Sequence, residues 1–446
     1  MARPSYPFTV RHRDVWTIAL PATFAFITEP LAGLVDLTVI GRLGDAYLLG
    51  GLVLGTLAFN FIFSMVFFLR LGTAGLVAQS IGAREADEGL IHFGRATLIA
   101  LVIGLALLVL TVPLIWLSVL LLGPGPDVIA AFETYMQVRM WSAPLVLINF
   151  ALLGWFYGRA EATTGMVLQF LVSGGNIVFS ILFVYGLGWG VAGVAFGTVL
   201  GELMAATTGL YLVARHFGGI RPIIIALPRE RLLELNGLKR LFALSRDLMI
   251  RSAALMGAFA FFTAQTARES AVVLAANAII LNFQMVTAFF LDGQAQAAEQ
   301  LCGRAVGANY RPAFDRAVKL SMGWGFLIGT VLFGVLVSAG PLLINLMTTA
   351  PDVRQVAYDN LFIASFMALT GVMPFVMDGV MQGATLNTII RNGMVAAFMI
   401  FLVAALILQP LYGMTGLWLS MHIFFLARGL IFWFAVKWKM PALFGG

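Results

Sequence analysis

Two carboxylates stand seven residues apart in the apolar segment "ITEPLAGLVDLTVIGRLG", which begins at Ile27. Seven residues make about two turns of an α-helix, so Glu29 and Asp36 are predicted to share one helix face. A charge at the middle of a bilayer costs roughly 2.5–3.5 kcal/mol, so Asp36 is expected to face a protein interior. There it either pairs with a cation or takes up a proton. We favour a proton-coupling role over a structural acid for Asp36, whereas for Glu29 helix packing beside Pro30 is an equal alternative.

The composition predicts the environment of these acids. Of the 446 residues, 61% are hydrophobic and only 11% are charged, whereas soluble domains average about 25% charged residues. Runs such as residues 96–122 exceed the roughly 20 apolar residues that cross a bilayer as a helix. We therefore predict an all-α polytopic membrane protein, surrounded by lipid.

Several other classes of protein do not fit the sequence. The single cysteine, Cys302, excludes an intramolecular disulfide and a cysteine metal cluster, and no His/Glu metal spacing occurs, so we expect no metal and no cofactor. The net charge of +6 is better explained by membrane topology than by a nucleic-acid partner. The first apolar stretch is too long for a signal peptide and is interpreted as a retained membrane helix.

Hydropathy divides the chain into twelve predicted spans. Their approximate cores are 15–40, 47–69, 93–122, 130–156, 164–186, 190–214, 242–265, 271–298, 317–346, 355–380, 389–409 and 412–436. Lys and Arg gather at the N-terminus, in alternate loops and in the central loop. The positive-inside rule then places both termini and the central loop in the cytoplasm.

Short motifs recur at a nearly constant offset. "IGAR" at Ile81 is similar to "VGAN" at Val306, "PDV" occurs at Pro126 and Pro351, and "GWFYG" at residue 154 parallels "GVMQG" at residue 379, each 225 residues on. Such repetition indicates a duplication, here of six helices in the same orientation. We predict a six-helix bundle at 1–215, a cytoplasmic linker at 216–240 and a second bundle at 241–446, which together suggest alternating access.

Further polar residues fall inside the predicted spans. In the second half, Arg251, Asp292, Glu299 and Asp378 form a predicted charged cluster, in which Arg251 is expected to neutralise Asp292 or Asp378 as a structural ion pair. In the first half, the residues expected to line a cavity are Tyr135, Asn149, Asn176, Ser180 and Thr198. Individually, such residues more often hydrogen-bond neighbouring helices than contact a ligand. Pro21 and Pro30 interrupt the hydrogen-bond ladder of the helix at 15–40, which is expected to bend.

The motifs taken together suggest a family. "EPLAGLVDLTVIGRLG", "VAQSIGAR", "RDLMIRS", "VLAANAIILN", "LDGQAQAAEQLCGRAVGA" and "MDGVMQGA" resemble the multidrug and toxic compound extrusion (MATE) family, and within it the DinF-like branch. The resemblance covers essentially the whole chain. It implies a V-shaped twelve-helix exporter that expels organic, often cationic and lipophilic, compounds in exchange for H⁺ or Na⁺.

The resemblance also assigns roles to residues. Asp36 matches the aspartate proposed to couple cations in DinF-like members, and Pro21 matches the proline that bends the first helix. The family's polar network corresponds to Tyr135, Asn149, Asn176 and Thr198. One departure is Ser180, which stands where many members carry a second aspartate. The helix at 242–265 also lacks the acid expected mid-membrane in Na⁺-type relatives, and both absences favour H⁺.

We therefore expect a monomeric, proton-coupled exporter of small molecules in a bacterial inner membrane, not an enzyme. Alternatives are a Na⁺-coupled exporter of the same fold and a flippase of a lipid-linked substrate, although flippases tend to have more helices and a basic cavity. A major-facilitator transporter shares the six-plus-six plan, but its basic loop motif is missing from "GAREADEGLIHFG". A lipid-phosphate enzyme would need clustered His, Asp and Arg at one interface, which the sequence does not offer.

Overall fold

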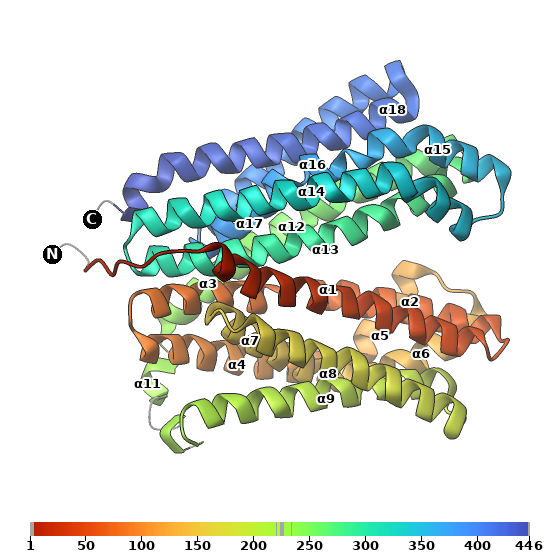
Figure 1. Ribbon diagram of the computed structural model, residues 1–446. Helices are drawn as coiled ribbons and strands as arrows, with labels where there is room; N and C mark the ends of the chain where they lie inside the picture. The colour runs from red at the N-terminus through yellow and green to blue at the C-terminus, as the bar shows by residue number, and fades with distance from the viewer. Residues whose placement is uncertain (1–3, 220, 224–226, 233, 445–446) are drawn as a thin grey trace. The chain divides into compact units, whose positions relative to one another are not determined.

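The structure, a computed structural model, describes residues 4–219, 221–223, 227–232 and 234–444, and this part of the chain is almost entirely helical, with no strand (Figure 1). The helices in the first half are α1 (His12–Gly41), α2 (Ala46–Ser64), α3 (Phe68–Gly82), α4 (Ala86–Val109), α5 (Thr111–Leu122), α6 (Pro126–Arg139), α7 (Ala143–Gly158), α8 (Ala162–Ile181) and α9 (Gly190–His216). Those in the second half are α11 (Arg229–Leu232), α12 (Leu235–Glu269), α13 (Ala271–Gly307), α14 (Arg311–Met347), α15 (Pro351–Ser365), α16 (Met367–Thr370), α17 (Val372–Gly383) and α18 (Asn387–Phe444). A 3₁₀ turn (Met140–Ser142) joins α6 to α7, and a π-helical turn (Leu182–Gly186) follows α8.

Eleven helical segments of the described chain are long and apolar enough to cross a membrane. The last of these, α18, is two helices joined at Gly413, whose φ of 57° and ψ of −135° are not helical. Glycine tolerates this conformation because it has no Cβ. Counting α18 as two helices gives twelve spans, so the prediction of an all-α, twelve-helix membrane protein is confirmed.

Proline explains where several helices are interrupted. Breaks or changes of helix type fall at Val109, Met140 and Thr370, each four residues before a proline (Pro113, Pro144 and Pro374). The proline ring clashes with the carbonyl four residues earlier and provides no N–H for it. The predicted span 93–122 is therefore two helices, α4 and α5. By contrast, α1 continues through Pro21 and Pro30, and the bend expected there stays a prediction.

The helices form two compact units. Phe24–Ile81 and Glu85–Ser245 form the unit called here the N-terminal unit, whereas the C-terminal unit contains the residues up to Thr23, Gly82–Arg84 and the residues from Arg246 onward. Helix α1 thus contributes to both units. Within the predicted linker 216–240, residues 220, 224–226 and 233 lie outside the described residues, and the described remainder includes α11 and the start of α12.

The two units repeat one mode of close packing. A Cβ added to Gly154 of α7 would collide with the backbone oxygen of Arg70 in α3, and one added to Gly158 would collide with that of Ala74. In the C-terminal unit, Gly379 and Gly383 of α17 meet the backbone oxygens of Ala295 and Glu299 in α13 in the same way. Each of these residues lies 225 positions after its counterpart. Small residues four apart let helices approach to backbone contact in membranes, so the sequence repeat corresponds to a repeated helix–helix interface.

We expect Gly379→Leu to destabilise the C-terminal unit by about 1–3 kcal/mol or more, because the added side chain must push α17 away from α13. Gly334→Leu in α14 is the matched control, since nothing lies within 4 Å of a Cβ added there. The measurement is the thermal unfolding midpoint of the purified protein in detergent. Equal midpoints for the two variants would contradict the close packing.

Candidate functional site

Asp36 lies in α1, half-buried beside α8 and α9. Its Oδ2 accepts a hydrogen bond of 3.1 Å from the Nδ2 of Asn176, and that same Nδ2 lies 2.5 Å from Oγ1 of Thr198. Ser180 lies one turn after Asn176 and near the same carboxylate, but its Oγ is buried without a hydrogen-bond partner among the described residues. Of the predicted polar residues, Asn176 thus contacts the predicted coupling acid directly, and Thr198 contacts Asn176.

Glycines in α9 make this arrangement possible. A Cβ added to Gly197 would lie 2.7 Å from the N and Oγ atoms of Ser180, and one added to Gly201 would lie 3.0 Å from the N atom of Asn176. Helices α8 and α9 are therefore in backbone contact at the level of both side chains. This contact fixes Asn176 and Ser180 next to Asp36.

The groups that contact Asp36 directly are neutral. Within the described residues, Asp36 forms no ion pair, and its Oδ1 is buried without a hydrogen-bond partner. The positive charge of Arg139 attracts the carboxylate without forming an ion pair with it. An amide and hydroxyl groups stabilise a carboxylate without neutralising it, and they also tolerate its protonated form. Oδ1 of Asp36 is therefore the carboxylate oxygen that the described residues leave without a hydrogen bond.

A second cluster in the N-terminal unit contains two ionisable residues that our sequence analysis did not single out. Arg139 at the end of α6 is buried, and its Nη2 lies 3.8 Å from Oε1 of Glu202 in α9. The Nδ2 of Asn149 donates to Oε2 of Glu202 at 2.6 Å. The guanidinium of Arg139 also lies 3.9 Å from the ring centroid of Phe59. Arg139 and Glu202 both fall inside predicted spans. The signal that identified Asp36, an ionisable residue within an apolar span, was therefore present for them too.

Glu29 belongs with this second cluster rather than with Asp36. Its side chain is exposed, unlike the half-buried Asp36, and the charges of Arg70 and Arg139 attract it. The guanidinium of Arg70 is surrounded by aromatic rings, with centroids 4.8–5.2 Å away: Phe26, Phe67 and Tyr157. Tyr135 accepts a hydrogen bond of 3.3 Å from Thr56. The predicted polar network is thus divided between a carboxylate held by neutral groups and a set of paired charges.

The charged cluster of the C-terminal unit is built differently. Oδ2 of Asp378 in α17 forms ion pairs with both Arg251 of α12 and Arg428 of α18. Asp378 and Arg428 are almost completely buried. Arg428 was not identified from the sequence, although it is an arginine inside the predicted span 412–436. Two arginines on one carboxylate hold it in its charged form, which fits a structural role for Asp378.

The remaining acids of this cluster lie on α13. Glu299 is buried and accepts a hydrogen bond of 2.9 Å from Nε2 of Gln296. Asp292 is half-buried and lies seven residues before Glu299, on the same face of α13. The charge of Asp292 attracts Arg251 and Arg428, and the charge of Glu299 attracts Arg251. The four predicted residues therefore do form one electrostatic group, with Arg428 as its fifth member.

Comparison with known proteins identifies the family. The MatE family model matches residues 21–182 and 248–411, one segment in each half of the chain. The chain belongs to the MatE family. It is accordingly a membrane transporter and not an enzyme, as the resemblance of the sequence motifs predicted.

Individual relatives cover nearly the whole of this MatE chain. DNA damage-inducible protein F of Escherichia coli (strain K12) is 32% identical over 424 residues, which are 95% of this chain and 91% of that protein. Protein DETOXIFICATION 44, chloroplastic, of Arabidopsis thaliana is 24% identical over 93% of this chain and 80% of its own length. A solved structure described as the outward-facing conformation of a multidrug resistance MATE family transporter of the MOP superfamily has a TM-score of 0.86 at 17% identity. It covers 98% of this chain and 99% of its own, and shows that the fold is shared.

We expect Arg428→Met to lower the stability of the C-terminal unit by about 3–5 kcal/mol, because it removes one partner of a buried ion pair. Arg311→Met is the matched control: Arg311 pairs with Asp315 at 3.4 Å, but both side chains are more than half exposed. Such a surface pair contributes about 0–1 kcal/mol. Unfolding midpoints in detergent test the contrast, and an unaltered midpoint for Arg428→Met would show that Asp378 does not depend on two arginines.

Proposed function

We propose that this MatE chain is a secondary exporter of small organic compounds, driven by inward proton flow through alternating access, with Asp36 as the proton-binding acid. Lipophilic and often cationic compounds are the proposed substrates. Support for export comes from the names of related proteins, DETOXIFICATION 44 and a multidrug resistance transporter. The bacterial relative supports a location in the plasma membrane, and the distribution of Lys and Arg supports cytoplasmic termini.

The observation that carries the proposal is the contrast between Asp36 and Asp378. Both are aspartates inside membrane spans, but Asp378 is bound by two arginines, whereas Asp36 contacts neutral donors. A carboxylate without an adjacent cation is costly in a low-dielectric interior, and binding a proton removes that cost. Asp36 is thus the acid whose charge is most readily switched, and Asp378 the acid whose charge is fixed.

The neutral groups around Asp36 suit a reversible proton site. Asn176 and Ser180 can stabilise the charged carboxylate, and neither adds a competing charge when the proton arrives. Loss of the charge changes the hydration of α1 and of the space beside it, which can shift the balance between two conformations. Helix α1 contributes to both units and contains Pro21 and Pro30. A conformational change at Asp36 can therefore be transmitted along the backbone of α1 from one unit to the other.

Na⁺ coupling is the second candidate, and one observation favours it. Oδ1 of Asp36 and Oδ1 of Asn176 are both buried oxygen atoms without a hydrogen-bond partner among the described residues. Oxygen atoms of this kind are the ligands that hard cations take. The transport experiment must therefore separate the two ions.

The test uses proteoliposomes loaded with a fluorescent lipophilic cation. We expect wild type to move the cation under a pH gradient without Na⁺, and Asp36→Asn to fall to the rate of empty liposomes, because asparagine cannot take up a proton. Asp359→Asn, an equivalent change at an exposed residue of α15, should retain wild-type transport. Glu29→Gln should retain coupling, since the charges near Glu29 compensate it.

Folding of each variant is checked by its gel-filtration profile and unfolding midpoint. Wild-type transport that requires a Na⁺ gradient and ignores the pH gradient would contradict proton coupling. Transport by folded Asp36→Asn under a pH gradient would contradict the role of Asp36.

A further inference from the structure

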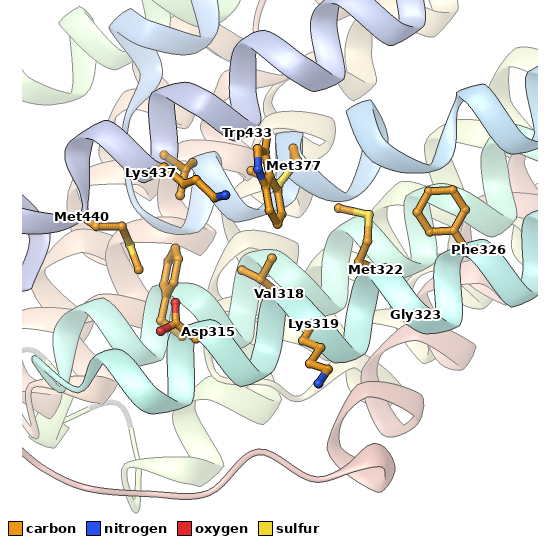
Figure 2. Close-up of a pocket in the computed structure, with 12 residues that line it drawn as sticks. Asp315, Val318, Lys319, Met322, Gly323, Phe326, Met377, Trp433, Lys437 and Met440 are labelled. Atoms are coloured by element: carbon orange, nitrogen blue, oxygen red, sulfur yellow. The ribbon is translucent and has the colours of Figure 1, made fainter.

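The C-terminal unit contains a cavity that the transport proposal does not use. Its volume is about 460 Å³, and it lies between α14, α17 and the final part of α18 (Figure 2). The lining is mainly apolar: Phe314, Met322, Phe326, Met377, Trp433 and Met440. Flexible methionines and aromatic rings form an adaptable wall suited to hydrocarbon.

Two lysines from different helices stand at this cavity. Lys319 comes from α14 and Lys437 from α18, and Figure 2 shows the ammonium group of Lys437 beside Trp433, with Lys319 extending outward from the lower edge. The Nζ of Lys437 lies 4.8 Å from the centroid of the Trp433 ring. Neither lysine forms an ion pair with any residue that the structure describes. The lining also contains one acid, Asp315, which pairs with Arg311 outside the lining. With two lysines and one aspartate, the lining keeps an excess of positive charge.

The cavity lies beside the start of α14 and the end of α18. It extends from Phe314, near the start of α14 at Arg311, to Phe326, about three turns of helix further on, and it reaches Met440 near the end of α18. Trp438 lies nearby in the sequence, with Nζ of Lys439 4.6 Å from its ring. Tryptophan and lysine gather at the level of the lipid headgroups, where lysine stems cover apolar surface and the ammonium groups reach water.

We propose that this cavity binds one anionic phospholipid, with an acyl chain against the methionines and its phosphate between Lys319 and Lys437. The apolar wall excludes a free inorganic anion as the natural occupant, because such an ion would leave that wall uncovered. A lipid without net charge would leave the excess positive charge of the lining uncompensated. Basic pockets between membrane helices are a recurrent mode of anionic headgroup recognition.

The test is native mass spectrometry of the full-length protein in detergent, titrated with dioleoyl-phosphatidylglycerol or dioleoyl-phosphatidylcholine. Two variants remove different parts of the site. Lys319→Gln/Lys437→Gln removes the charge, and Gly323→Phe fills the cavity, since Gly323 lines it and has nothing within 4 Å of an added Cβ.

Each variant has a matched control on the same helices. Arg316→Gln/Lys439→Gln makes the same change of net charge outside the cavity lining, at one exposed and one half-buried residue. Gly334→Phe makes the same change at another open glycine of α14. These controls separate a built site from a general effect of surface charge or of a bulkier helix.

We expect wild type to bind one phosphatidylglycerol in preference to phosphatidylcholine. The double lysine variant should bind it about 30-fold more weakly, and Gly323→Phe should lose the bound lipid, while both controls resemble wild type. Equal binding of the two lipids by wild type would overturn the proposal. So would an equal loss of phosphatidylglycerol in the lysine variant and its charge-matched control.

Discussion

The cost of placing a charge away from water is the constraint on which the rest of this structure depends. Asp378 meets it with two arginines from two other helices, and the result is a cross-link of α12, α17 and α18. Arg139 and Glu202 meet it by approaching one another, with Asn149 as an additional donor. Among these acids, Asp36 has no ion pair with a described residue and accepts a hydrogen bond from the amide of Asn176. An acid stabilised in this incomplete way is suited to gaining and losing a proton, whereas the paired acids are suited to holding helices together.

Close helix packing supplies the geometry for both arrangements. Glycines at Gly197 and Gly201 bring α9 against α8 at Asn176 and Ser180, and Gly379 brings α17 against α13 near the C-terminal charges. Lipid offers no hydrophobic drive for helices to associate, so backbone contact and polar pairs must provide the stability. The same glycine pattern in both halves indicates that the packing was duplicated, while the charges that it positions differ between the units.

Much of this could be predicted from the sequence. Apolar length and charge distribution are sufficient for the number of spans, and the offset of 225 residues between motifs corresponds to equivalent interfaces at Gly154 and Gly379. The partners of each charge were harder to foresee. Arg428 lies far along the chain from its partner Asp378, and Glu202 lies far from its partner Arg139. A sequence pattern shows that a buried charge needs a partner, but it does not show which residue the fold brings to that charge. Helix breaks near Pro113 and Pro374 were missed because hydropathy does not register a lost hydrogen bond.

The central claim is that the charge on Asp36 is switched by a proton. Its most direct test is proton release when substrate is added to the purified protein in weakly buffered detergent, followed with a pH indicator dye. We expect wild type to release protons on addition of a lipophilic cation, and Asp36→Asn to release none while remaining folded. Release of the same number of protons by Asp36→Asn would contradict this account and place the proton on another acid, with Asp292 and Glu299 of α13 the next to examine.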